Sequence, residues 1–428
     1  MGHTGPMKLS RPAWPSREEF LEDLRTIRRR LGRWVRSLAA ATRREYGGLD
    51  LVEIARRLRR EVFGNPLAGR ALYGLTVTAW AAFIVWGRFL VPLATAPYFR
   101  PETRFQVIGF FENGTGPQFV DSWPTFQRYA DLFDVVSPFW YSVDSSGKIV
   151  GDGYRPEVVN LARSRGIRVI PLVTNLKQSS GNGFDAIRTA SARAKTVENL
   201  SNLVAARDYD GLNLGYELLP PEARESYSAF VTALGGALRG QGRTLLVSVF
   251  PDVEVSPAVS GFFDYRAIGR AADGIILLVY DLHYSATDPG PVAPLPWAEA
   301  GVDSLLGYVS PGKVILGVGS YAYDWPTASE NGIAEYLSAA TALARAQAEG
   351  VPVHLDPASR QSFFTYVSET GIKREVWLQN AQHLADKAAL ARAKGLSGLA
   401  VWRLGFSEDG ALDLLAETLG RRIDRAGP

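Results

Sequence analysis

The residues best suited to chemistry are a glutamate and the run before it, Asp210-Gly-Leu-Asn-Leu-Gly-Tyr-Glu217. Alternate side chains of an extended strand share a face, so Asn213, Gly215 and Glu217 are predicted to lie on one side. A carboxyl group at the end of such a strand is suited to general-acid catalysis. Taken by itself, a lone glutamate there is more often a surface residue or half of a structural ion pair.

The amino-acid composition excludes several other classes of catalytic and metal-binding site. The chain has no cysteine, which excludes disulfides, thiolate metal sites and cysteine nucleophiles. Its four histidines, His3, His283, His354 and His383, form no HExxH pattern, which argues against a histidine-based metal site. We therefore expect carboxylates, tyrosines and amides to carry the chemistry, with no metal ion and no organic cofactor.

Short apolar runs alternate with longer helical patterns from residue 104 onward, as in parallel βα units. The eight runs are Phe105–Phe111, Val135–Trp140, Val169–Thr174, Gly211–Gly215, Leu245–Phe250, Gly274–Tyr280, Val314–Gly319 and Gly398–Leu404. Eight parallel strands predict an α/β fold, a closed (β/α)8 TIM barrel over residues 100–428. The alternative, an open doubly wound sheet, lacks the G-x-G-x-x-G that would follow its first strand.

Two further features follow from the barrel. The long gap after the seventh run predicts a small insertion lobe, residues 320–375, over the barrel mouth. Active sites of such barrels lie at the carboxyl ends of the strands. Glu217 should therefore reach the mouth after the fourth strand, and Glu112, which ends the first, should line the groove.

The first 70 residues form a basic arm, with sixteen Lys and Arg against eight Asp and Glu, although the whole chain carries only +3. Ser16 and Glu19 have the spacing of a capping box, and apolar residues recur at helical spacing over 20–38. The arm is thus predicted to be a basic amphipathic helix, lying on anionic lipid, pairing with a partner helix, or packing as a solvated helix on residues 51–63. It has no DNA-reading motif, so no nucleic-acid partner is expected, and its partner stays unknown.

An apolar segment follows the arm. Residues 71–87 are seventeen residues without a charge, which as a helix span roughly 25 Å, close to the hydrocarbon thickness of a bilayer. Residues 71–99 are therefore predicted to be one transmembrane signal-anchor helix; the alternative is a buried helix of a soluble domain. The positive-inside rule then leaves the arm cytoplasmic and places the barrel outside the cell membrane.

The run from Asp210 to Glu217 resembles the DGxDxDxE motif of glycoside hydrolase family 18, which includes chitinases. It looks most like the branch of spore-cortex peptidoglycan enzymes, in which Asn is common at the position of Asn213. Four further segments resemble that branch in the same order: 279–297 with its PGPVAPLPW run, 321–325, 375–377 and 401–405. The likeness covers about residues 105–418.

The resemblance implies a fold, a reaction and roles for particular residues. In that family a glutamate protonates the glycosidic oxygen while the 2-acetamido carbonyl of the sugar attacks the anomeric carbon. Glu217 would be the acid, Tyr280 the partner of the acetamido group, Asp281 a supporting carboxylate, and Trp402 the aromatic floor under the sugar. Asp210 and Gly215 would also belong to the substrate site through the motif. The implied substrate is peptidoglycan or a chitin-like polysaccharide.

Gly215 departs from the motif, because the family normally has an Asp there that orients the acetamido group. Loss of one such contact typically raises the barrier by about 3 kcal/mol. Asn213 or Asp281 would have to reach the vacated space, or the substrate would have to be held differently. Two functions therefore stay open: a membrane-anchored glycosidase, favoured by Glu217, and a catalytically weak or inactive barrel that binds wall carbohydrate, favoured by Gly215.

Overall fold

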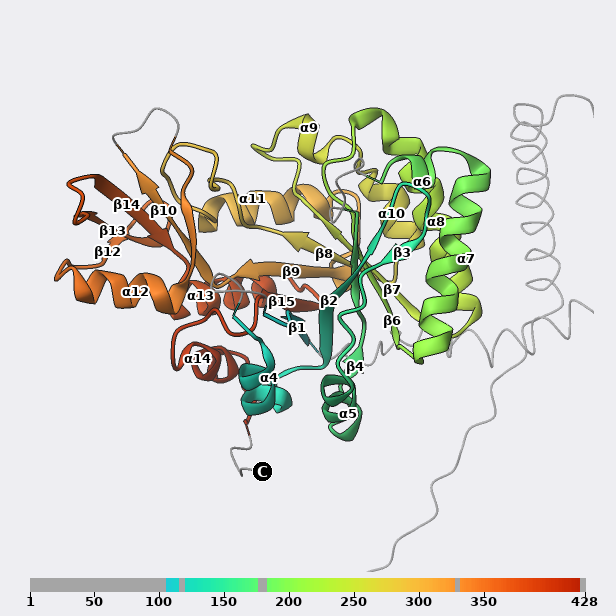
Figure 1. The fold of residues 1–428 in the computed structure, drawn as a ribbon, viewed down its shortest axis with the longest axis horizontal. Helices are drawn as coiled ribbons and strands as arrows, with labels where there is room; N and C mark the ends of the chain where they lie inside the picture. The colour runs from blue at the N-terminus through green and yellow to red at the C-terminus, as the bar shows by residue number, and fades with distance from the viewer. Residues whose placement is uncertain (1–104, 115–119, 176–182, 328–331, 424–428) are drawn as a thin grey trace, which may run out of the picture. The chain divides into compact units, whose positions relative to one another are not determined.

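The computed structural model describes residues 105–114, 120–175, 183–327 and 332–423 (Figure 1). Its centre is a closed parallel barrel in which β1 pairs with both β15 and β2. The barrel strands are β1 (Gln106–Phe111), β2 (Val135–Val143), β4 (Arg168–Val169) continued by β5 (Leu172–Thr174), β6 (Gly211–Gly215), β7 (Thr244–Val249), β8 (Gly274–Leu278), β9 (Val314–Gly319) and β15 (Gly398–Trp402). Each predicted strand is present, so the predicted eight-stranded barrel is confirmed.

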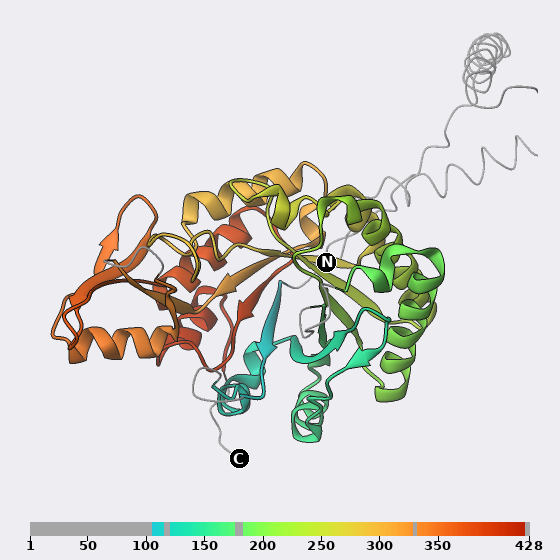
Figure 2. The same ribbon diagram turned by 45° about the horizontal axis from the view of Figure 1, so that its top comes forward.

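Helices surround the barrel on its outside, as the turned view in Figure 2 shows. They are α4 (Trp123–Tyr129), α5 (Pro156–Ser164), α6 (Asp185–Arg188), α7 (Ala190–Arg207), α8 (Arg224–Gly240), α9 (Pro257–Ser260), α10 (Tyr265–Ala271), α11 (Leu295–Leu306), α13 (Ala381–Ala393) and α14 (Ala411–Thr418). Short 3-10 turns lie at Ala130–Leu132, Pro221–Ala223 and Pro311–Lys313, and β3 (Ile149–Val150) forms a hairpin with β2.

The barrel strands read as continuous apolar runs because both of their faces are buried. In β1, Ile108 and Phe110 belong to the cluster inside the barrel, whereas Val107 and Phe111 pack with the cluster under the helices. The same alternation in β6 turns Leu212 and Leu214 toward the helices. Asn213 and Gly215 therefore face the barrel interior, as predicted.

Aspartates tie neighbouring strands together at the end of the barrel where the strands begin. Asp134 accepts a hydrogen bond from the Val107 N–H at 2.8 Å, and Asp273 accepts one from the Leu245 N–H at 2.9 Å. Asp210 does the same for Val169 at 2.8 Å. In each case a carboxylate just before one strand satisfies a backbone donor of the previous barrel strand, which fixes the register at the closed end.

The insertion after β9 has an antiparallel sheet of its own, in the order β11-β10-β14-β13-β12. Its elements are β10 (Tyr321–Pro326), β11 (Glu335–Ser338), α12 (Ala339–Ala348), β12 (His354–Asp356), β13 (Gln361–Val367) and β14 (Lys373–Leu378). In Figures 1 and 2 this lobe, in orange, extends from the side of the barrel opposite helices α6, α7 and α8.

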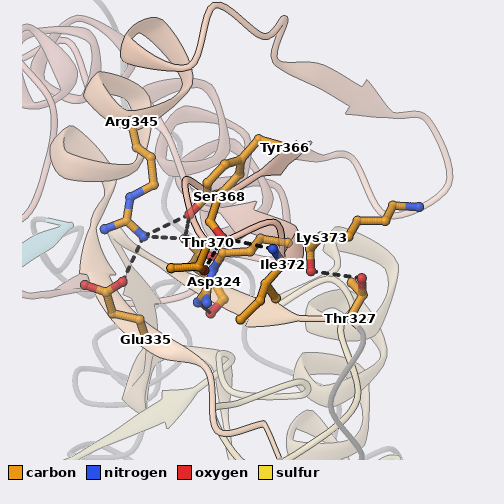
Figure 3. A network of polar contacts seen from close by, with 10 residues as sticks. Asp324, Thr327, Glu335, Arg345, Tyr366, Ser368, Thr370, Ile372 and Lys373 are labelled. Atoms are coloured by element: carbon orange, nitrogen blue, oxygen red, sulfur yellow. Dashed lines mark hydrogen bonds and ion pairs between the residues drawn. The ribbon is translucent and has the colours of Figure 1, made fainter.

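The lobe is held together by a buried aspartate. Asp324 is fully buried and accepts hydrogen bonds from Arg374 Nε at 2.6 Å and Tyr366 Oη at 2.7 Å, and it also pairs with Arg345. Arg345 reaches Glu335 of β11 at 2.8 Å (Figure 3). One carboxylate thus joins α12 to strands β10, β13 and β14.

The arm (1–70) and the apolar segment (71–99) lie outside the described residues, so their predicted structures stay predictions. Within the described ranges, no helix is both long enough and apolar enough to cross a bilayer.

Asp324→Ala should destabilise the protein by about 3 kcal/mol, because removing one partner of a buried ion pair leaves the remaining charges uncompensated. Denaturant unfolding of the barrel and lobe measures this. The control is Asp303→Ala, whose partner Lys394 it meets at 2.7 Å on the surface, where a pair contributes about 0 to 1 kcal/mol. Equal losses in the two variants would contradict a structural role for Asp324.

Candidate active site

A cavity of about 260 Å³ opens at the carboxyl ends of the barrel strands, where the first lobe strand leaves the barrel. Its lining combines carboxylates, hydroxyls and aromatic rings: Glu112, Phe139, Asp281, Tyr321, Tyr323, Tyr336, Trp402 and Arg403. A larger hollow of about 500 Å³ lies among α8, α9 and α10. It contains none of the residues predicted to act in catalysis, so the mouth cavity is the candidate site.

Glu217 lies two residues beyond the end of β6 and is half-buried. Its backbone is clamped by the side chain of Asn175: Asn175 Nδ2 donates to the Glu217 carbonyl at 2.8 Å, and the Glu217 N–H donates to Asn175 Oδ1 at 2.9 Å. Leu218 follows with φ +54°, a conformation that costs a bulky residue on the order of 1 kcal/mol or more. The clamp and this turn fix the direction of Glu217.

No described residue forms a hydrogen bond with the Glu217 carboxyl group; the bonds recorded for Glu217 are those of its backbone. Burial, and to a smaller extent the nearby charge of Asp281, raise its pKa to about 7. A carboxyl group with this pKa carries a proton in much of the population at neutral pH, as a general acid requires.

Asp281 follows β8 and takes φ +62°, which aspartate tolerates better than most residues. Its Oδ1 accepts hydrogen bonds from Tyr321 Oη and, at 3.2 Å, from Tyr323 Oη. Burial raises the pKa of Asp281 and the two hydroxyl bonds lower it, and the net result is a rise to about 6. Asp281 therefore gives up its proton more readily than Glu217.

Tyr280 is buried beside both carboxyl groups. Burial raises its pKa, and the charges of Glu217 and Asp281 raise it further, so its hydroxyl group stays protonated. Trp402 is half-buried at the end of β15, with its ring edge-on to Phe110 at 5.2 Å between centroids. Glu112 pairs with the buried Arg403 across the mouth.

The structure thus brings five predicted site residues to one mouth: Glu112, Glu217, Tyr280, Asp281 and Trp402. Asn213 lies lower in the barrel, fully buried, where it accepts from Ser248 Oγ at 3.0 Å and its Nδ2 contacts Ser137 Oγ at 3.3 Å. Its amide is thereby occupied in joining β2, β6 and β7. Gly215 lies between Asn213 and the mouth.

Asp210 does not come to the mouth, contrary to the expectation from the motif. It precedes β6, so the whole strand, roughly 16 Å at 3.3 Å per residue, separates it from Glu217. Its carboxylate bonds the Val169 N–H at the opposite end of the barrel. Asp210 precedes the first residue of β6, so it lies at the end of the barrel away from the mouth. There it contributes to strand register and not to the substrate site.

Several residues of the mouth were not predicted from the sequence: Phe139, Asn175, Tyr321, Tyr323, Tyr336 and Arg403. Tyr321 and Tyr323 carried a usable signal, since their spacing of two places both hydroxyls on one face of a strand. Asn175 ends a short apolar run and had no signal, because only the fold brings it to Glu217.

The arrangement suits acid catalysis on a neutral substrate with charge stabilisation by a second carboxylate. A protonated Glu217 can donate to a leaving oxygen, and Asp281, whose Oδ1 accepts two hydroxyl hydrogen bonds, can stabilise positive charge beside it. Among the described residues, no three His, Asp or Glu side chains gather as metal ligands. The absence of a cofactor stays a prediction.

Comparison with known proteins identifies the family of the barrel. The profile of "Glycosyl hydrolases family 18" matches residues 118–407. A cortical fragment-lytic enzyme of Bacillus anthracis is 25% identical over 260 residues, which are 58% of this chain and 60% of that enzyme.

Solved structures resemble the fold. A chitinase from Chromobacterium violaceum is 28% identical with a TM-score of 0.68, over 74% of this chain and 100% of that one. The spore cortex-lytic enzyme SleL of Bacillus cereus, at 21% identity, has a TM-score of 0.67 over 76% of each chain.

The raised pKa of Glu217 predicts a pH-dependent gain in stability for Glu217→Gln. Between the ordinary glutamate pKa of about 4.3 and about 7, the folded protein holds a proton that the unfolded chain releases, so stability falls as pH rises. Glutamine removes this titration. The melting temperature of the variant, relative to the wild type, should therefore rise from pH 4 to pH 8. Glu222→Gln, at an exposed position of the same loop, should show no such trend; equal trends would contradict the assignment.

Proposed function

The chain belongs to glycosyl hydrolase family 18, and on this premise we propose that it hydrolyses N-acetylglucosamine-containing glycan of the cell wall, with Glu217 as the acid. The observation that carries the proposal is the pair of unequal carboxyl groups at the barrel mouth. Burial raises the pKa of both, but Asp281 accepts hydrogen bonds from two tyrosine hydroxyls, whereas the Glu217 carboxyl group accepts none from the described residues. Glu217 is therefore the better proton carrier of the two.

In the proposed reaction, Glu217 donates its proton to the glycosidic oxygen as the bond from that oxygen to the anomeric carbon breaks. The carbonyl oxygen of the sugar's acetamido group forms the new bond to the anomeric carbon, which gives a cyclic, positively charged intermediate. The Glu217 carboxylate then takes a proton from water, and the water oxygen attacks the anomeric carbon as the bond from the acetamido oxygen to that carbon breaks. The acid is restored, and no nucleophile from the protein is consumed.

Other residues of the mouth support this scheme by position. The Tyr280 hydroxyl group stays protonated and lies near both carboxyl groups, so it can donate to the acetamido oxygen. Trp402 presents a half-buried ring at the cavity, and an aromatic face suits the apolar face of a sugar ring.

The substrate class follows from the relatives. One is named a cortical fragment-lytic enzyme and another, among the solved structures, a chitinase. Peptidoglycan is the proposed substrate, with chitin-type oligomers as analogues that share its N-acetylglucosamine. Chitin oligomers are defined compounds, so they are the practical substrates for kinetics.

A second function is favoured by Gly215, which supplies no side chain where the family motif has an aspartate. Without that carboxylate the barrel could bind wall glycan and not cleave it. The retained, protonatable Glu217 favours catalysis, and the assay of the Glu217 variant decides between the two functions.

Residues 71–99 are proposed to anchor the barrel to the cell membrane, with the arm cytoplasmic and the barrel outside. The support is the uncharged run of residues 71–87 after the basic arm. The full chain should sediment with membranes, and deletion of residues 71–99 should release it to the soluble fraction. Deletion of residues 8–69, which keeps the apolar run, should leave it bound. A full chain that stays soluble would contradict the anchor.

Glu217→Gln should lower kcat on N-acetylglucosamine oligomers at least about a hundredfold, because general-acid catalysis contributes roughly 10² to 10⁴. Release of reducing ends by the purified chain, on oligomers and on peptidoglycan, measures this. Binding of the oligomers should persist, since the amide has nearly the shape of the acid. Glu222→Gln, exposed on the same loop, is the matched control and should retain full activity.

A wild type that binds glycan without releasing product would establish the binding function in place of the enzyme. Activity that survives in Glu217→Gln would show that another group is the acid.

A further inference from the structure

The position of Gly215 is not an empty space. A Cβ atom added there would lie 2.6 Å from Leu172 Cδ1 and 3.8 Å from Thr174 Cγ2. The first distance is shorter than real Cβ contacts, and Leu172, in the neighbouring strand β5, is 5% exposed. Its side chain belongs to the interior cluster with Ile170, Leu246 and Tyr280. Leucine on one strand therefore fills the volume that a side chain on the other would need.

This packing makes the β5–β6 side of the site apolar. Leu172 offers neither a charge nor a hydrogen bond to a substrate or to Glu217. The charged group that acts on Glu217 is Asp281, which follows β8, two strands from β6 in the barrel. The carboxylate partner of the acid therefore comes from the end of β8 alone, and β6 supplies none.

The lobe holds Asp281 in place. Tyr321 and Tyr323 come from β10, the first strand of the lobe sheet, and both hydroxyls donate to the same oxygen, Oδ1. No described residue bonds Oδ2 of Asp281. Tyr336 of β11 packs against both rings, with centroids 5.0 Å and 5.5 Å away. The carboxylate is thus anchored through one oxygen, and the other is available to a ligand.

We propose that Asp281, and not a side chain at position 215, orients the acetamido group and stabilises the positive charge of the intermediate, and that Tyr321 and Tyr323 are positioning residues which the lobe supplies for it. Leu172 occupies the space that a side chain at position 215 would need, so no carboxylate is placed on that strand. This inference rests on the proposed glycosidase function. The acetamido N–H would donate to Oδ2, while the tyrosine hydroxyls keep Oδ1 fixed.

The test is the pH dependence of kcat and KM for Tyr321→Phe and Tyr323→Phe on N-acetylglucosamine oligomers. Each variant should lower kcat about tenfold, because the charged carboxylate loses one of its hydrogen bonds, while KM changes less than twofold. The hydroxyl bonds lower the pKa of Asp281, so their loss should move the acidic limb of the profile to higher pH.

Tyr366→Phe is the matched control. Its hydroxyl group also donates to a buried aspartate, Asp324 at 2.7 Å, but inside the lobe (Figure 3). It should leave kcat and the pH profile unchanged. Profiles of the Tyr321 and Tyr323 variants that match this control would overturn the positioning role, while the wild type remained an active enzyme. A wild type without any activity would instead overturn the proposed function, and the catalytic role of Asp281 with it.

The packing claim has a separate readout that does not need activity. Gly215→Asp should lower the melting temperature, because the new side chain meets Leu172. Leu172→Ala combined with Gly215→Asp should melt higher than the sum of the two single changes predicts, since the smaller residue makes room. A Gly215→Asp protein that melts like the wild type, or strictly additive changes, would overturn the pairing of Leu172 with Gly215.

Discussion

The site depends on two carboxyl groups that share one poorly solvated mouth and yet must hold different charges. Desolvation raises the pKa of both, and the charge of Asp281 raises that of Glu217 further. Two hydroxyl bonds act on Asp281 in the opposite direction, whereas the carboxyl group of Glu217 has no hydrogen bond from the described residues. In the proposed reaction, this difference in hydrogen bonding assigns the proton to Glu217 and the negative charge to Asp281.

The barrel and the lobe together produce this difference between Glu217 and Asp281. The barrel supplies Glu217 at the end of β6 and Asp281 at the end of β8, each beside a backbone turn with positive φ. The lobe supplies the tyrosines, since β10 continues from β9 across a single residue, Ser320. The buried pairing of Asp324 with Arg345 and Arg374 holds the lobe sheet together. Its stability therefore bears on the chemistry, because a displaced β10 would release Asp281 from its hydroxyl donors.

The effect of Gly215, which stands where the family motif has an aspartate, depends on the residues packed around it. Alone, a glycine in place of an aspartate implies a lost interaction and a weakened site. In the fold, Leu172 occupies the adjoining volume, so the interior is closely packed there. The carboxylate that β6 lacks therefore has a counterpart in Asp281, which follows β8 and is held by the two tyrosines of the lobe.

The amino-acid sequence by itself determined the barrel, because strands buried on both faces must be apolar runs, and eight such runs alternate with helical patterns. It also determined that Glu217 ends the fourth strand with Asn213 and Gly215 on the same face, since that follows from the strand period of two. Tertiary structure alone decided what surrounds them. Asn175 clamps Glu217, Leu172 fills the space beside Gly215, Tyr321 and Tyr323 bind Asp281, and Asp210 lies at the far end. These contacts join strands distant in sequence, and no local period or propensity encodes which side chains meet across a barrel.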